Sequence, residues 1–142
     1  MSSLPPATVM RLWFEEVWNG RRADRIATYL APDALMHGLD GTGEPAPGPD
    51  AFARFHARFL AAFPDIRFTL HEVIEQGDRA AARWTVHATH EGEGLGIAPT
   101  GERVALEGMS MIRVRDGQAA EVWNVYDQMR LAMACRLVVP AA

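Results

Sequence analysis

Residues 121–127 read Glu-Val-Trp-Asn-Val-Tyr-Asp and follow a turn at Asp116-Gly117. The β-branched and aromatic residues predict a strand, and alternation along it places Trp123, Val125 and Asp127 on one face. An aspartate that shares a face with a tryptophan and a valine is out of place on a solvated surface. Two interpretations are open. The carboxylate accepts hydrogen bonds from nearby backbone amides, or it lies in an apolar pocket that raises its pKa and suits it to general acid/base catalysis.

The rest of the second half is also predicted to be β-structure. Polar and apolar residues alternate over several segments, and turns containing Gly and Asp separate them. A Gly-rich loop at 91–101 interrupts the pattern once. Successive strands joined by short turns predict an antiparallel meander. The predicted strands are residues 67–75, 79–90, 103–115 and 119–127.

The first half of the chain is predicted to be helical, because its apolar residues recur at helical spacing. Asn19-Gly20 ends the first helix. Asp24 can cap the second, which stops before Pro32, and the third follows a Gly/Pro-rich loop at 40–49. Helices that precede an antiparallel meander indicate an α+β domain with the helices packed on one face of a curved sheet. The predicted helices are residues 9–19, 24–30 and 52–63.

A histidine on the long strand at 79–90 is a second candidate for the site. Alternation places Trp84, Val86, Ala88 and His90 on one face, which is apolar and should therefore face the helices. A lone histidine at a strand end is usually a structural residue held by hydrogen bonds. A histidine and Asp127 that converge on one apolar cavity favour a functional site.

Length and composition limit the function further. The 142 residues are expected to form one domain, 1–142, and no apolar run approaches the ~20 residues of a membrane span. With 14 basic and 18 acidic residues the net charge is −4, and no basic cluster suggests nucleic-acid binding. One cysteine excludes an internal disulfide, and we see no signal peptide, so a cytoplasmic location is expected. The histidines lack a metal-ligand spacing, so no metal site is expected.

An ordered set of short motifs resembles a known family. Each motif is weak alone, but their order along the chain is specific, and together they resemble the SnoaL-like polyketide cyclases over roughly residues 8–131. The motifs are the helix Phe-Glu-Glu-Val-Trp-Asn at 14–19, Phe-Pro-Asp at 63–65, the segment Arg-Trp to His-Glu-Gly at 83–92, Gly-Ile-Ala-Pro-Thr-Gly at 96–101 and Trp-x-x-x-Asp at 123–127.

The resemblance implies a fold and a chemistry. The fold is the cone-shaped α+β barrel of the nuclear transport factor 2-like superfamily: a strongly curved mixed, mostly antiparallel sheet with about three N-terminal helices on its concave face, usually as a dimer. Characterised members close a polyketide ring by intramolecular aldol condensation without metal or organic cofactor. The acid/base aspartate of the family matches Asp127, and its histidine matches His90. His37 is a looser match to a polar pocket residue. Residues 128–137 depart from the helix that often follows in the family, which alters the C-terminal lining.

This chemistry assigns roles to individual side chains. Asp127 would remove a proton next to a carbonyl, while His90 and His37 would donate to the oxygen. Aromatic residues would provide flat walls for a small hydrophobic ligand, a polycyclic aromatic one included. The aromatic stripe of the third helix is predicted to be mainly core, with its inner residues also touching the ligand. The expected substrate-binding residues are His37, Trp13, Trp84, Trp123, Phe55 and Phe59.

Other functions remain open on the same fold. A non-catalytic binding protein would use Asp127 and His90 as a satisfied pair bonded to each other. An isomerase resembling ketosteroid isomerase would need a second pocket acid and a tyrosine donor, and Tyr126 falls on the other strand face. An epoxide hydrolase is disfavoured because Arg83 and Arg113 also point away from the expected cavity.

The sheet face opposite the helices predicts self-association. If Trp84 and Trp123 face inward, the opposite face is more apolar than a solvated sheet needs. We therefore expect a homodimer that packs sheet against sheet, although a β-bulge can swap the parity locally. The residues expected on this face are Met109, Met111, Val122, Asn124 and Tyr126.

Overall fold

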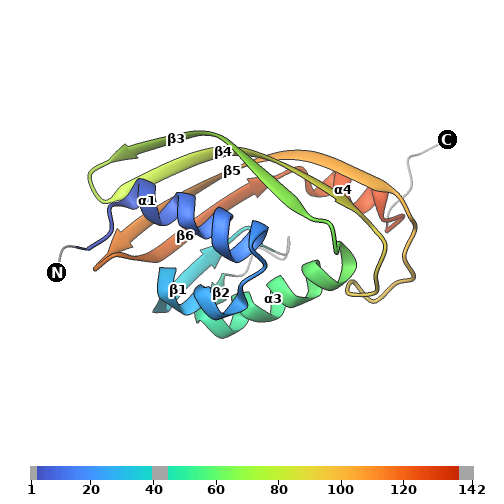
Figure 1. Ribbon diagram of the computed structural model, residues 1–142, viewed down its shortest axis with the longest axis horizontal. Coiled ribbons are helices and arrows are strands. Elements are labelled where there is room, and N and C mark those ends of the chain that lie inside the picture. Colours follow the sequence, from blue (N-terminus) through green and yellow to red (C-terminus); the bar gives the residue numbers. More distant parts are fainter. Residues whose placement is uncertain (1–2, 40–44, 138–142) are drawn as a thin grey trace.

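The computed structural model describes residues 3–39 and 45–137, which contain a six-stranded sheet in the order β2-β1-β6-β5-β4-β3. Helices lie against the concave face of the arched sheet, and the first and last helices, α1 and α4, lie toward opposite ends of the molecule (Figure 1). This α+β architecture agrees with the sequence prediction. The strands are β1 Leu30–His37, β2 Ala46–Pro47, β3 Arg67–Gln76, β4 Arg79–Thr89, β5 Arg103–Arg115 and β6 Gln118–Tyr126. The helices are α1 Pro6–Leu12, η1 Trp13–Asn19, η2 Ala23–Arg25, α2 Ile26–Tyr29, α3 Gly48–Ala62 and α4 Gln128–Ala134.

The strand β1 was not predicted, and it makes the sheet mixed. It pairs in parallel with β6, so that His37 lies beside Trp123. The predicted helix at 24–30 shrinks to one short turn of 3₁₀-helix and the short α2, because the chain turns extended at Leu30. Asp24 caps neither helix, since its carboxylate bonds to Arg22 instead. Of the predicted loop at 40–49, residues 40–44 lie outside the described residues, and Ala46–Pro47 form β2.

The first predicted helix changes its winding halfway. After α1, the segment η1 is a π-helix, and it buries Phe14, Val17 and Trp18 against the sheet. Its end is fixed by Asn19, whose side chain exchanges two hydrogen bonds of 2.8 Å with the backbone of Phe68. This wider helix therefore carries two large aromatic rings over the concave face of the sheet.

The inward parity of β4 and β5 agrees with the prediction, but that of β6 is the reverse. Trp84 lies opposite Gly108 on β5, and on β6 Asn124 lies opposite Ser110. Directly opposed residues of antiparallel strands share a face, so Val122, Asn124 and Tyr126 face the helices with Trp84. The predicted inward set of Trp123, Val125 and Asp127 is therefore wrong. Register against β5, with a bulge between Arg113 and Val114, overrides the apolar alternation of β6.

The last helix, α4, closes the end of the sheet where β6 stops (Figure 1). Asp127 is its N-cap, and the Asp127 side chain accepts a 3.0 Å hydrogen bond from the backbone N–H of Arg130. Among the described residues, no helix is long and apolar enough to cross a membrane.

Candidate functional site

A cavity lies between the concave face of the sheet and the helices. Its walls enclose about 700 Å³, counting the part that is open to solvent. From the helices it is lined by Trp13, Phe14 and Trp18 of η1 and by the Phe52, Phe55 and Phe59 stripe of α3. The rings support one another: the centroids of Phe55 and Phe59 lie 4.4 Å apart, and those of Trp13 and Phe52 lie 4.7 Å apart. This side of the cavity is a continuous aromatic surface that suits a flat, apolar molecule.

The sheet provides the opposite side of the cavity. Trp84 of β4 is part of this side and is 5% exposed. Four of the predicted substrate-binding residues, Trp13, Trp84, Phe55 and Phe59, thus lie in the cavity lining. Their contact with a substrate stays a prediction.

Apart from the tryptophans, polar side chains in the described lining come only from Ser110, Asn124 and Tyr126, all on the sheet side. The Trp84 indole N–H donates to Ser110 Oγ at 3.1 Å, and Ser110 donates to Asn124 Oδ1 at 2.8 Å. The Tyr126 hydroxyl donates to the backbone oxygen of Leu39. Apart from the indole N–H groups of the tryptophans, the hydrogen-bonding side chains of the described lining therefore all lie on the sheet side.

Asp127 does not lie in the interior. Its side chain is 47% exposed, caps α4 and lies 3.4 Å from the Arg130 guanidinium. The prediction that it is largely buried beside Trp84 and Trp123 is wrong, because the register of β6 places Asp127 at the strand end on the outer parity. Of the two interpretations offered by the sequence, the geometry matches a strand-end aspartate bonded to a backbone amide. Its neighbours Tyr126 and Leu131 do line the cavity.

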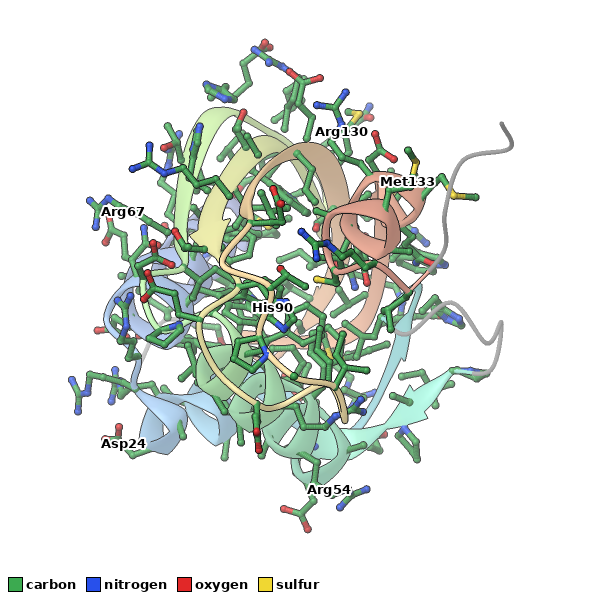
Figure 2. The ribbon with its side chains drawn as sticks, turned by 90° about the vertical axis from the view of Figure 1, so that its right-hand side faces the viewer. Asp24, Arg54, Arg67, His90, Arg130 and Met133 are labelled. Carbon is green, nitrogen blue, oxygen red and sulfur yellow. The ribbon has the colours of Figure 1, made fainter. Side chains whose placement is uncertain are left out.

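His90 is completely buried, and in Figure 2 it lies in the interior while Arg130 and Met133 of α4 point outward. Its Nδ1 accepts a 3.3 Å hydrogen bond from the Thr100 backbone N–H, so the neutral ring carries its proton on Nε2. Nε2 has no hydrogen-bond partner in the described part of the chain. His90 does not line the cavity. Its ring centroid lies 5.5 Å from that of Phe63, which does line the cavity. The Nε2–H group of His90 is therefore an unpaired donor among the described residues, and the Phe63 ring lies next to the His90 ring.

His37 and Trp123 lie outside the cavity, on the other face of the sheet. The two rings stack with centroids 5.6 Å apart, and His37 Nε2 contacts Glu121 Oε2 at 2.8 Å. The Arg79 guanidinium lies 5.6 Å from the centre of the Trp123 ring. The expectation that Trp123 lines the cavity is wrong, because the register of β6 against β5 turns Trp123 outward. His37 lies beside Trp123 in the parallel β1–β6 ladder, so it lies on the outer face too.

A smaller cavity adjoins the first and shares Trp13, Phe14, Ser110 and Asn124 with it. Its wall includes Tyr29, whose pKa is raised by burial and by its short hydrogen bond to the Glu16 carboxylate. The same bond lowers the pKa of Glu16. Arg25 bonds to both side chains, so this cluster is internally satisfied and ties η1 to α2.

Two other features of the described residues bear on chemistry. His56, under the aromatic stripe, bonds to the Val17 backbone oxygen at 2.8 Å, and burial lowers its pKa. No cluster of three or more His, Cys, Asp or Glu side chains in residues 3–39 and 45–137 could hold a metal ion.

The sequence analysis missed Asn124 and Ser110 as cavity residues. Ser110 gave a signal, since it is the one hydroxyl in the inward series Val104, Leu106, Gly108, Ser110 and Ile112. Asn124 gave none alone, because its orientation depends on the strand register.

The fold is the one seen in nuclear transport factor 2-like proteins. The family model of the SnoaL-like polyketide cyclases matches residues 8–134, and the chain belongs to this family. Aklanonic acid methyl ester cyclase AcmA of Streptomyces galilaeus is 30% identical over 105 residues, which are 72% of this chain and 72% of AcmA.

Solved structures agree with this membership. IdmH of Streptomyces antibioticus, described as a candidate polyketide cyclase, has a TM-score of 0.78 and 28% identity, covering 94% of this chain and 99% of IdmH. AclR of Streptomyces galilaeus, described as a candidate hydroxylase, has a TM-score of 0.79 and 26% identity, covering 96% and 84%. A SnoaL-like protein of Jannaschia sp. CCS1 shares the fold, with a TM-score of 0.81, 19% identity and coverage of 93% and 92%.

Proposed function

We propose that this chain is a cofactor-independent cyclase that closes a ring of a polyketide-derived substrate by intramolecular aldol chemistry. The observation that carries the proposal is the aromatic cavity, with Ser110, Asn124 and Tyr126 on its sheet side, in a SnoaL-like chain that is 30% identical to the cyclase AcmA. Such a cavity can hold a flexible chain folded on itself, with its reacting carbons close together. Pre-organisation of this kind supplies a large part of the acceleration in intramolecular reactions.

Asp127 remains our proposal for the acid/base group. It directly follows the lining residue Tyr126, and the lining residue Leu131 is one helical turn further along. A side-chain rotation toward the cavity gives up an exposed ion pair with the Arg130 guanidinium, which is worth little, and the cap of α4, which costs about 0.5–2 kcal/mol. His90 is proposed as a donor to a substrate oxygen through its bare Nε2–H, which requires a movement of Phe63.

The structure bears on two alternative functions, a binding protein and an isomerase. A binding protein in which Asp127 and His90 bond to each other does not fit, because Asp127 bonds to Arg130 and His90 to Thr100. An isomerase gains one feature, since Tyr126 faces the cavity and supplies the tyrosine that this hypothesis lacked. It still lacks a carboxylate among the described lining residues.

The test uses aklanonic acid methyl ester, the compound in the name of AcmA, as the first substrate. Ring closure by aldol addition gives a product of unchanged mass, and subsequent dehydration removes one water. Asp127→Asn should lower turnover by about 10²–10⁴-fold, because asparagine keeps the shape and the helix cap but cannot take up a proton. Arg130→Gln is the control: it removes the ion pair and should retain turnover.

Three outcomes would change the proposal. Retained turnover in Asp127→Asn would exclude Asp127 as the base and make His90→Gln the next variant. A product heavier by one oxygen would favour the hydroxylase chemistry described for AclR. Binding of aromatic ligands without turnover of any enolisable substrate would favour the binding protein.

A further inference from the structure

We propose that Asn124 is the oxygen-binding residue of the cavity: one of its amide protons donates to a carbonyl or enolate oxygen of a planar ligand. Ser110 and Trp84 hold the amide in that orientation. The chemical use of this contact rests on the proposed function, but the contact itself is a binding site that can be tested without turnover.

A hydrogen-bonded chain of Trp84, Ser110 and Asn124 crosses the concave face of the sheet from β4 to β6. The indole donates to Ser110 Oγ at 3.1 Å, and the Ser110 hydroxyl donates to Asn124 Oδ1 at 2.8 Å. Asn124 Nδ2 then donates to the His37 backbone oxygen on β1 at 3.1 Å. The chain thus runs in one direction, donor to acceptor, over four neighbouring strands.

This direction fixes the orientation of the amide. The indole of Trp84 can only donate, so Ser110 accepts from it and turns its own proton toward Asn124. A flipped amide would place Oδ1 against the carbonyl oxygen of His37, two acceptors with no proton between them. The NH₂ group of Asn124 is therefore held toward β1, with one proton bound by His37.

The backbone is shaped to permit this chain at two glycines. Gly108 lies opposite Trp84, and a Cβ at Gly108 would come within 2.4 Å of the indole ring. The missing side chain lets the indole lie across β5 and reach Ser110. Gly38 has φ +78°, and a Cβ there would come within 2.0 Å of the Asn124 backbone oxygen. Gly38 thus lets the end of β1 approach Asn124 closely.

The second proton of Asn124 Nδ2 is the group available to a ligand. The structure shows no acceptor for it among residues 3–39 and 45–137, while Asn124 lines both cavities. Asn124 is partly exposed, and apart from Ser110 and Tyr126 the lining around it is aromatic and aliphatic, so this N–H lacks a protein partner there. A ligand oxygen that accepts but does not donate would supply it. The chemistry points to a flat ketone, or the enolate formed from it.

The test compares 9-fluorenone with fluorene, which have the same rings and differ in one carbonyl oxygen. Affinities follow from quenching of tryptophan fluorescence, and the carbonyl stretch of bound 9-fluorenone reports its hydrogen bond in the infrared. The intact protein should bind 9-fluorenone about two- to tenfold more tightly than fluorene, and the stretch should fall to lower frequency.

Variants assign the donor. Asn124→Leu should bind both probes equally and restore the unshifted stretch. Ser110→Ala should weaken the preference and broaden the stretch, because the amide loses its fixed orientation while its protons remain. Tyr126→Phe should keep both signals. Met129→Asn, at an exposed position on α4, is the control and should behave as the intact protein.

Several results would overturn the proposal. An unshifted stretch in the intact protein would do so without any variant, which matters if Asn124→Leu fails to fold after leaving the His37 oxygen unpaired. Loss of the shift in Tyr126→Phe but not in Asn124→Leu would move the site to Tyr126. Failure of both probes to bind would contradict both a ligand-binding role for the cavity and the oxygen-binding role of Asn124. If the protein cyclises its substrate but shows no preference for 9-fluorenone, only the oxygen-binding role of Asn124 is wrong. If the preference is present but no cyclisation occurs, only the proposed function is wrong.

Discussion

Gly108 allows the Trp84 indole to lie close against strand β5. A methyl group at this position has no room, because the ring atoms of Trp84 are 2.4 Å from where a Cβ would stand. The indole also contacts the rings of Phe14 and Phe68, with centroids 6.0 and 5.1 Å away, so it cannot simply move aside. The absence of one side chain therefore positions the sheet side of the cavity.

We predict that Gly108→Ala destabilises the protein by about 1–3 kcal/mol, the usual cost of overpacking a close-packed core. Chemical denaturation measures the change. The double variant Gly108→Ala/Trp84→Leu should be less than additive, since leucine at 84 removes the ring that the methyl group strikes. Additive effects would show that the contact between the two residues is not the cause.

At the residue scale, the sequence placed His90 better than Asp127. His90 directly follows β4, whose apolar alternation is long enough to define its inner face, and the structure buries His90 as expected. The β6 stretch carries large residues on both faces, so alternation alone favoured Trp123 and Val125. The structure buries Val122 and leaves Val125 73% exposed. Side-chain size on one strand could not reveal a choice that depends on its neighbour.

At the element scale, α4 depends on its first residue. This helix spans only Gln128–Ala134, and no residue of it is buried. Asp127 caps its start, and Cys135, which is 1% exposed, stands at its end. A short helix with few buried contacts relies on its cap to stay folded.

We predict that Asp127→Ala opens α4 more often than Asp127→Asn does. Loss of a helix cap costs about 0.5–2 kcal/mol, whereas asparagine caps nearly as well as aspartate. Reaction of Cys135 with a thiol reagent measures the opening, because the thiol is buried until the helix end moves. Modification should be about two- to thirtyfold faster in Asp127→Ala, if opening precedes reaction. Equal rates in the two variants would mean that the cap does not hold the helix.

The helices show why element boundaries were harder to predict than element types. The spacing of apolar residues predicted one helix at 9–19, but a π-helix with nearly the same spacing occupies its second half. Leu30 was assigned to a helix because it follows Tyr29 in a helical pattern, yet β1 begins there. A strand beside β6 can only be recognised once the sheet it joins exists.

At the scale of the whole molecule, the α+β class, the curved sheet and the concave helical layer could all be predicted. They follow from the order of helices before strands and from an ordered set of motifs across the chain. The outer face of the sheet was predicted in part: Met109 and Met111 are 55% and 42% exposed as expected. Val122, Asn124 and Tyr126 were wrongly expected beside them, and Val125 and Trp123 take those places.

We predict that the chain forms a dimer through this outer face, which carries Met109, Met111 and Val125. Val125→Glu should weaken the dimer by more than about tenfold, because a two-fold interface brings like charges together. Sedimentation over a range of concentrations measures the change. Met129→Glu, on α4 and 62% exposed, is the control and should leave the dimer intact. A monomer at micromolar concentration in the unaltered protein would contradict the prediction.

The two sides of the cavity differ in how freely they can vary. On the helix side the lining consists of aromatic rings that contact one another, and exchanging one such ring for another changes the cavity shape without breaking a hydrogen bond. On the sheet side, Trp84, Ser110 and Asn124 depend on one another and on two glycines. Drift among relatives and directed evolution should therefore reshape the substrate range through α3 and η1. Replacements on the sheet side would have to arrive as compensating sets.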